Sequence, residues 1–207
     1  MNMPELYKEH YVDKEYTSIG LFRQLKNKYD IDKAFYPGCY VHITPSLVFS
    51  NVTYADSYRN TFEFFESVET LAFIEKNKEY SEEPIFKFYQ QDYNKPFKEL
   101  TDDFDLIISQ YAGFVGQAAK PYLRKGGLLV CNNSHGDASM ASLDSDYRLI
   151  AVYRRKSDEQ FSISAKNIED YLQPRSGVLP TRKELMKTMK GIAYSKSPSG
   201  YIFEKAE

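Results

Sequence analysis

The sequence lacks the features that mark membrane, secreted and nucleic-acid-binding proteins. No apolar run reaches the roughly 18–20 residues that a membrane-spanning helix needs. With two cysteines in 207 residues and a polar first stretch, the chain is expected to be cytoplasmic. A net charge of −2 provides no basic field for nucleic acid or an anionic membrane surface. We therefore expect neither kind of partner.

Tryptophan is absent as well, and we find no internal repeat or low-complexity segment. The other aromatic residues are abundant, with 18 tyrosines and 14 phenylalanines, which favours an aromatic core with tyrosines at its rim. The length suits one domain with a sizeable core. Within it we expect an N-terminal helical cap (1–30), a sheet domain (31–165) and a packed extension of helix and hairpin (166–207).

The glycine-rich loop of nucleotide-binding proteins is nearly missing, although the strands and helix that normally surround it are indicated by the sequence. The stretch Lys33–Ser57 contains an apolar-aromatic run, a turn at Gly38, a segment with helical potential, a second apolar run and Asp56. This order is typical of the first βαβ crossover of a nucleotide-binding sheet. Gly38 and Asp56 are 18 residues apart, close to the roughly 20 expected between the glycine turn and a ribose-binding acid.

Further strands and helices alternate along the chain. The apolar run Phe104–Ser109 is typical of a strand buried on both faces. The expected strands are 33–36, 51–55, 85–89, 104–109, 128–131, an antiparallel pair at 147–154 and 161–164, and a hairpin at 192–196 and 201–204. The main helices are expected at 17–29, 59–77, 114–124 and 181–190. The pattern predicts an α/β fold with a doubly wound, mostly parallel seven-stranded sheet and antiparallel closing strands.

This order of elements resembles the class I S-adenosylmethionine-dependent methyltransferases. The most specific part is Phe104–Ser109 followed, after a helix, by Tyr122–Val130, which is similar to the family's fourth strand and its turn into the fifth. The resemblance covers roughly residues 18–164. It implies a Rossmann-like methyltransferase fold, S-adenosylmethionine as cofactor, and methyl transfer to an unidentified, small-molecule acceptor.

The resemblance also implies cofactor-binding residues after the second and third strands. Asp56, with Ser57 beside it, would accept hydrogen bonds from the two ribose hydroxyls, because a carboxylate offers four lone pairs. Asp92 would lie by the adenine amino group, with Tyr93 near the ring. Both acids are also common turn and capping residues, and that alternative stays open.

The loop after the first strand departs from the family's pattern. Gly38 matches the first of three spaced glycines, Tyr40 and His42 stand at the other two positions, and Tyr36 replaces an acid. Glycine there lets the backbone approach a ligand without a Cβ in the way. We include Cys39 with Tyr36, Gly38 and Tyr40 among the expected cofactor-binding residues. The alternative function is a non-catalytic, methyltransferase-like binding or scaffold domain that has lost the cofactor.

Candidate catalytic and acceptor-binding side chains follow the first, fourth and fifth strands. Methyl transfer is an in-line displacement, so it needs positioning, and a general base only when the acceptor must lose a proton. Ser109 and Gln110 are expected to line the methionine and acceptor side of the site. The expected catalytic residues are His42, Tyr111, His135 and Asp137.

The two cysteines are expected to be ordinary thiols. Cys39 and Cys131 would end strands about two strand spacings apart, roughly 10 Å, which is too far for a disulfide. A zinc site is not expected, because the C-x-x-H and C-x-x-x-H pairs are common by chance. The aromatic tail residues Tyr194, Tyr201 and Phe203 leave a homodimer edge open as an alternative to a substrate lid.

Overall fold

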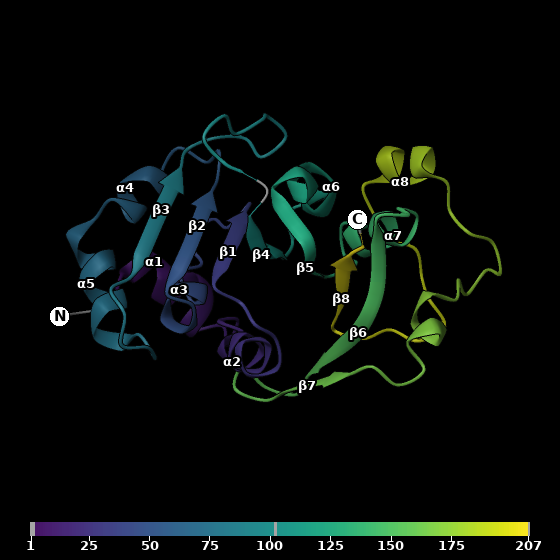
Figure 1. The fold of residues 1–207 in the computed structure, drawn as a ribbon, viewed down its shortest axis with the longest axis horizontal. Helices are drawn as coiled ribbons and strands as arrows, with labels where there is room; N and C mark the ends of the chain where they lie inside the picture. Colours follow the sequence, from purple (N-terminus) through teal and green to yellow (C-terminus); the bar gives the residue numbers. More distant parts are fainter. Residues whose placement is uncertain (1–2, 102, 207) are drawn as a thin grey trace.

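The computed structural model describes residues 3–101 and 103–206, whose strands form one eight-stranded sheet (Figure 1). The strand order is β3-β2-β1-β4-β5-β8-β6-β7. The strands are β1 (Lys33–Pro37), β2 (Asn51–Ala55), β3 (Ile85–Tyr89), β4 (Phe104–Ser109), β5 (Leu123–Cys131), β6 (Tyr147–Arg155), β7 (Phe161–Ser164) and β8 (Gly200–Lys205).

The first five strands are parallel, and the sequence-based prediction of a doubly wound, mostly parallel sheet is confirmed. β8 runs antiparallel to both β5 and β6, so β6 points the same way as β5. β7 pairs antiparallel with β6 as expected, and the insertion of β8 between β5 and β6 brings the sheet to eight strands where seven were expected. The carboxyl ends of β1, β4, β5 and β6 consequently share one edge of the sheet.

Helices cover both faces of the sheet (Figure 1). The alternation along β1 separates two cores, because Ala34 and Tyr36 pack on one face and Phe35 on the other. The face of Tyr36 is covered by α1 (Glu5–Tyr7), the π-helical turn η1 (Lys8–Val12), α2 (Ile19–Lys28), α3 (Pro45–Val48), α4 (Thr61–Phe65) and α5 (Val68–Asn77). The face of Phe35 is covered by α6 (Val115–Ala119), the 3₁₀ turn η2 (Lys120–Tyr122) and α7 (Asp137–Ser142).

The tail contributes the 3₁₀ turn η3 (Ile168–Leu172) and α8 (Arg182–Thr188). The helix α8 begins where expected, because Thr181 and Glu184 form a capping box at its start. None of the helices in the described part of the chain has the length and apolar character needed to cross a membrane.

The predicted helix 59–77 is wrong in one respect, because it is two helices. Ser67 has an extended backbone, and its side chain accepts a hydrogen bond from the Thr70 amide, which caps the start of α5. On the second helix, Val68 and Leu71 are exposed to solvent.

The predicted helix 114–124 ends early. Pro121 sits in the 3₁₀ turn η2, and β5 already begins at Leu123. Gly126 and Gly127 therefore lie within the strand element, at a shift in register between β4 and β5, and the first of them has a φ of +73°.

The predicted hairpin 192–196/201–204 is also wrong. Residues 201–204 do form a strand, but they pair with β5 and β6, whereas Tyr194 makes only an isolated bridge with Pro174. β8 has buried side chains on both faces, with Tyr201 and Phe203 in one core and Ile202 in the other. A strand of this kind is stable inside a sheet and not at its border.

Candidate functional site

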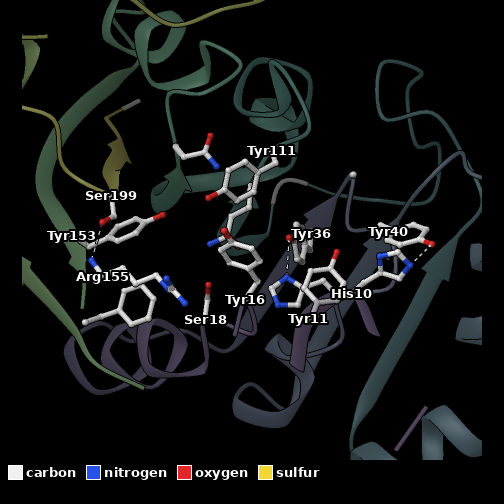
Figure 2. Close-up of a pocket in the computed structure, with 15 residues that line it drawn as sticks. His10, Tyr11, Tyr16, Ser18, Tyr36, Tyr40, Tyr111, Tyr153, Arg155 and Ser199 are labelled. Carbon is white, nitrogen blue, oxygen red and sulfur yellow. Dashed lines mark hydrogen bonds between the residues drawn. The ribbon is translucent and has the colours of Figure 1, made fainter. Parts of the chain in front are cut away.

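A cavity of about 730 Å³ lies at the shared carboxyl edge of the sheet (Figure 2). Its floor is formed by the ends of β1, β4, β5 and β6, and its cover by the N-terminal arm, residues 7–18. Figure 2 shows Tyr16 and Tyr111 in the middle, His10 and Tyr40 at one end, and Arg155 at the other. The volume falls within the roughly 300–1,000 Å³ of small-molecule sites.

The arm is held over the cavity by aromatic contacts and hydrogen bonds. The Tyr11 ring stacks on His42, with centroids 4.2 Å apart, and the His10 ring meets Tyr40 edge-on at 5.1 Å. Further back, the hydroxyls of Tyr7 and Thr44 are hydrogen-bonded at 2.7 Å. These contacts fix the arm as an aromatic cover.

His42 is buried, and both ring nitrogens have partners. Nε2 lies 2.9 Å from the Thr17 carbonyl and must donate to it, so Nδ1 accepts from the Tyr36 hydroxyl at 3.1 Å. Burial lowers the pKa of His42 to about 4, against the opposing effects of the Thr17 hydrogen bond and the Asp158 charge. His42 lines the cavity as a neutral side chain that connects β1 to the arm.

The loop after β1 is organised by Asp56. Its Oδ2 accepts from the Tyr40 amide at 2.7 Å and its Oδ1 from the Tyr58 amide at 2.8 Å. Gly38 has a φ of +70°, a backbone conformation that favours glycine. A Cβ at this position would also lie 2.4 Å from the Cβ of Ala112 in the loop after β4, so the close approach of the two loops requires glycine here. Gly38 and Tyr40 line the cavity, whereas Asp56 lies just behind Tyr40, outside the lining.

The cofactor-binding candidate Cys39 after β1 and those after β2 and β3 also lie outside the cavity lining. Ser57 is exposed, and Cys39 is buried in the core, where burial raises the pKa of its thiol. Asp92 accepts from the Asn94 amide at 2.9 Å and closes a turn. The Tyr93 hydroxyl donates to the Ala112 carbonyl, so its ring crosses from the loop after β3 to the loop after β4.

Gln110 and Tyr111, which follow β4, line the cavity. Tyr111 has a φ of +62° and a side chain that is 65% exposed, and a left-handed backbone is unfavourable for an aromatic residue. Such strain is found where the surroundings need a side chain in one place. Ser109 instead points into the interior, where its hydroxyl donates to Asp137 Oδ2 at 2.5 Å.

Two of the four expected catalytic residues do not reach the cavity. Asp137 begins α7, is 3% exposed, and accepts from the Gly116 amide at 2.9 Å as well as from Ser109. Burial raises the pKa of this carboxyl to about 6, although both hydrogen bonds lower it. His135 is exposed, with Nδ1 3.0 Å from the Ser134 hydroxyl. The structure brings together His42 and Tyr111 but neither His135 nor Asp137.

Sequence reasoning missed much of the cavity lining. The missed residues come from the arm, from the loop after β5, and from β6 to β8: His10, Tyr11, Tyr16, Ser18, Asn132, Tyr153, Arg155, Phe161 and Ser199. The position of Asn132 directly after an apolar strand was an available signal. No local sequence signal could have identified the β6 residues, because they reach the cavity only through the insertion of β8 between β5 and β6.

Metal-binding chemistry is not supported by a ligand cluster in the described part of the chain, where no three His, Cys, Asp or Glu side chains gather suitably. Cys39 and Cys131 are both free and buried.

Comparison with known proteins places the chain by its fold. No protein-family model matches the sequence, and no curated protein matches it. Among solved structures it is similar to the N-methyltransferase NodS from Bradyrhizobium japonicum, solved with S-adenosyl-L-homocysteine: 12% identity, 79% of this chain, 90% of that chain and a TM-score of 0.50. A methyltransferase from Geobacter sulfurreducens shows 13% identity over 71% of this chain and 81% of that chain, with a TM-score of 0.47. With its sheet order and the likeness to NodS, the chain has the class I S-adenosylmethionine-dependent methyltransferase-like fold.

Proposed function

We propose that this protein is an S-adenosylmethionine-dependent methyltransferase that binds its cofactor and a small-molecule acceptor in the cavity. The observation that carries this proposal is the position of the cavity relative to the sheet. The strand order reverses between β1 and β4, and Gly38 and Gln110, which follow these two strands, both line the cavity. In open α/β sheets, ligands bind outside the carboxyl ends of the strands at such a switch point.

The residues around the switch point fit the cofactor. Each Asp56 oxygen accepts one backbone hydrogen bond, which leaves lone pairs for the two ribose hydroxyls. The tyrosine rings of the cover, with Tyr111 opposite, provide the electron-rich faces that attract a cation such as a sulfonium. Gly38 and Tyr40, with Asp56 just outside the lining behind Tyr40, would hold the nucleoside part, and Gln110 and Tyr111 the methionine part.

Bound there, S-adenosylmethionine would supply an electrophilic methyl group. The residues of the chain act mainly by position, because the arm and Tyr111 enclose the reacting groups and hold them in line. His42 has no free ring nitrogen, and no aspartate or glutamate lines the cavity within the described residues.

Replacement of Asp56 by alanine is expected to weaken cofactor binding about tenfold or more, which is about 1.4 kcal/mol. The variant removes the ribose acceptor and also releases the Tyr40 and Tyr58 amides. The measurement is calorimetric titration with S-adenosylmethionine and S-adenosylhomocysteine, for which we expect micromolar binding to the unaltered protein.

The matched control is Asp170→Ala, which removes an exposed carboxylate that pairs with Lys196 in the tail and leaves the cavity intact. Equal affinities for the two variants would contradict the role of Asp56. Absence of binding to unaltered, folded protein at high ligand concentration would overturn the enzyme function and support a non-catalytic domain.

A further inference from the structure

The end of the cavity farthest from Asp56 carries a positive charge whose nearest carboxylate, Asp158, lies outside the cavity lining. Arg155 ends β6, and no aspartate or glutamate of the described chain lines the cavity with it. In the sheet order, β6 is four strand positions from β1, which corresponds to roughly 19 Å at about 4.7–4.9 Å per position. The charge therefore lies beyond the place that the cofactor would occupy over β1 and β4.

The protein uses the Arg155 guanidinium only in part. One terminal nitrogen donates to the Glu15 carbonyl and lies 3.7 Å from Asp158 Oδ1, too far for a hydrogen bond. The Asp158 carboxylate is engaged elsewhere, because it accepts from the amides of Thr17 and Ser18 at 2.9 and 2.8 Å. Arg155 Nε is buried and has no hydrogen-bond partner among the described residues.

A second donor in the cavity wall also lacks an acceptor. Asn132 follows β5 and is 7% exposed. Its Oδ1 accepts from the Ser134 hydroxyl at 2.7 Å and the Ser134 amide at 3.2 Å, which fixes the orientation of the amide group. Its Nδ2 finds no acceptor within the described residues. A buried donor without a partner costs free energy, so it points to a missing ligand or water.

The walls between these donors are aromatic. The Arg155 guanidinium lies over the Tyr16 ring, 5.4 Å from its centroid, and Figure 2 shows the Tyr153 ring beside it with Tyr111 above. The Tyr153 ring packs directly against the backbone of Gly200, so closely that a Cβ at Gly200 would lie 2.2 Å from the ring. The space is therefore suited to a flat, apolar body with an anionic group at one end.

We propose that this end of the cavity binds the methyl acceptor, and that the acceptor is a small aromatic carboxylate. The carboxylate is held by Arg155 and Asn132, and the ring lies among Tyr16, Tyr111 and Tyr153. A single guanidinium with one neutral amide donor matches the one charge and two oxygens of a carboxylate better than a doubly charged phosphate. This inference rests on the proposed methyltransferase function, since it assigns the second substrate of the same cavity.

The test uses 4-hydroxybenzoate as the probe and its uncharged analogue 4-hydroxybenzamide as the control ligand. Both are titrated calorimetrically into protein saturated with S-adenosylhomocysteine. We expect the benzoate to bind at least tenfold more tightly than the benzamide. This preference should disappear in Arg155→Gln and in Asn132→Asp, which places a negative charge beside the carboxylate. It should be retained in Arg154→Gln, since the neighbouring Arg154 is exposed and lies over Tyr171 outside the cavity.

A further titration distinguishes the acceptor's carboxylate from that of S-adenosylhomocysteine, because Arg155 could bind either of them. If Arg155→Gln weakens S-adenosylhomocysteine but not 5′-methylthioadenosine, which lacks the amino-acid part, Arg155 binds the cofactor and the acceptor assignment is overturned. Equal benzoate and benzamide affinities with normal S-adenosylhomocysteine binding would overturn this inference alone. Absence of S-adenosylhomocysteine binding would overturn the proposed function itself, and the acceptor role with it.

Discussion

Replacement of Phe35 by alanine is expected to lower the free energy of unfolding by about 3–5 kcal/mol, the usual cost of truncating a fully buried aromatic side chain. Phe35 is 0% exposed and lies in the middle of β1. Its ring contacts Phe97 edge-on at 5.4 Å, Phe104 in a stacked arrangement at 5.2 Å and Tyr122 edge-on at 5.9 Å. These contacts join β1 to β4 and to the turn before β5, so a cavity at this position cannot be filled by one neighbour alone.

The measurement is urea unfolding followed by far-UV circular dichroism. Phe62→Ala is the matched control, because Phe62 is the same residue type but 47% exposed, and a loss within about 0.5 kcal/mol is expected there. A similar loss in both variants would show that the aromatic cluster around Phe35 does not carry the stability assigned to it.

Much of the sheet could be predicted because its signals are local. The run Phe104–Ser109 is apolar at four of its six positions, and the structure shows it paired on both sides. The acid Asp56 follows directly after the second apolar run, and the structure places it at the carboxyl end of β2. In both cases the residues that determine the element are adjacent in the sequence.

The cavity could not be predicted to the same extent, because its residues meet through long-range pairing. Tyr153 and Arg155 reach the cavity only because β8, nearly fifty residues later, separates β6 from β5 and makes it parallel to β5. The arm has no apolar period that would reveal the contacts of His10 with Tyr40. Asp137 was misplaced because the chain turns at Gly136, with a φ of +88°, and the helix α7 that follows carries the carboxyl into the interior.

The two buried titratable groups His42 and Asp137 are expected to give opposite responses of stability to acid. The folded-state pKa of His42 is about 4, below its ordinary 6.5, so between these values the unfolded chain binds a proton that the folded chain does not. Acidification through this range therefore lowers the free energy of unfolding, by about 3 kcal/mol at 1.36 kcal/mol per pKa unit.

For Asp137 the sign is reversed. Its folded-state pKa is about 6, above its ordinary 3.8, so between these values the folded chain binds the proton and the unfolded chain does not. Acidification from about pH 6 to about pH 4 then raises the free energy of unfolding, again by about 3 kcal/mol. In the unaltered protein the two effects largely cancel over this range, and single variants should separate them.

We therefore expect Asp137→Asn to lose about 3 kcal/mol relative to the unaltered protein between pH 7 and pH 4, and His42→Phe to gain about as much over the same range. Urea unfolding at each pH gives these differences, and subtraction of the unaltered protein removes the contribution of all other titrating groups. Phe62→Ala is the control, because it changes no titratable group, and its difference should stay constant with pH. If the Asp137 and His42 differences are also independent of pH, or move in the same direction, then the burial of these groups does not set their titration. In that case we would have to abandon the assignment of His42 as a neutral side chain between the arm and β1. A protonated ring could not accept a hydrogen bond from the Tyr36 hydroxyl at Nδ1.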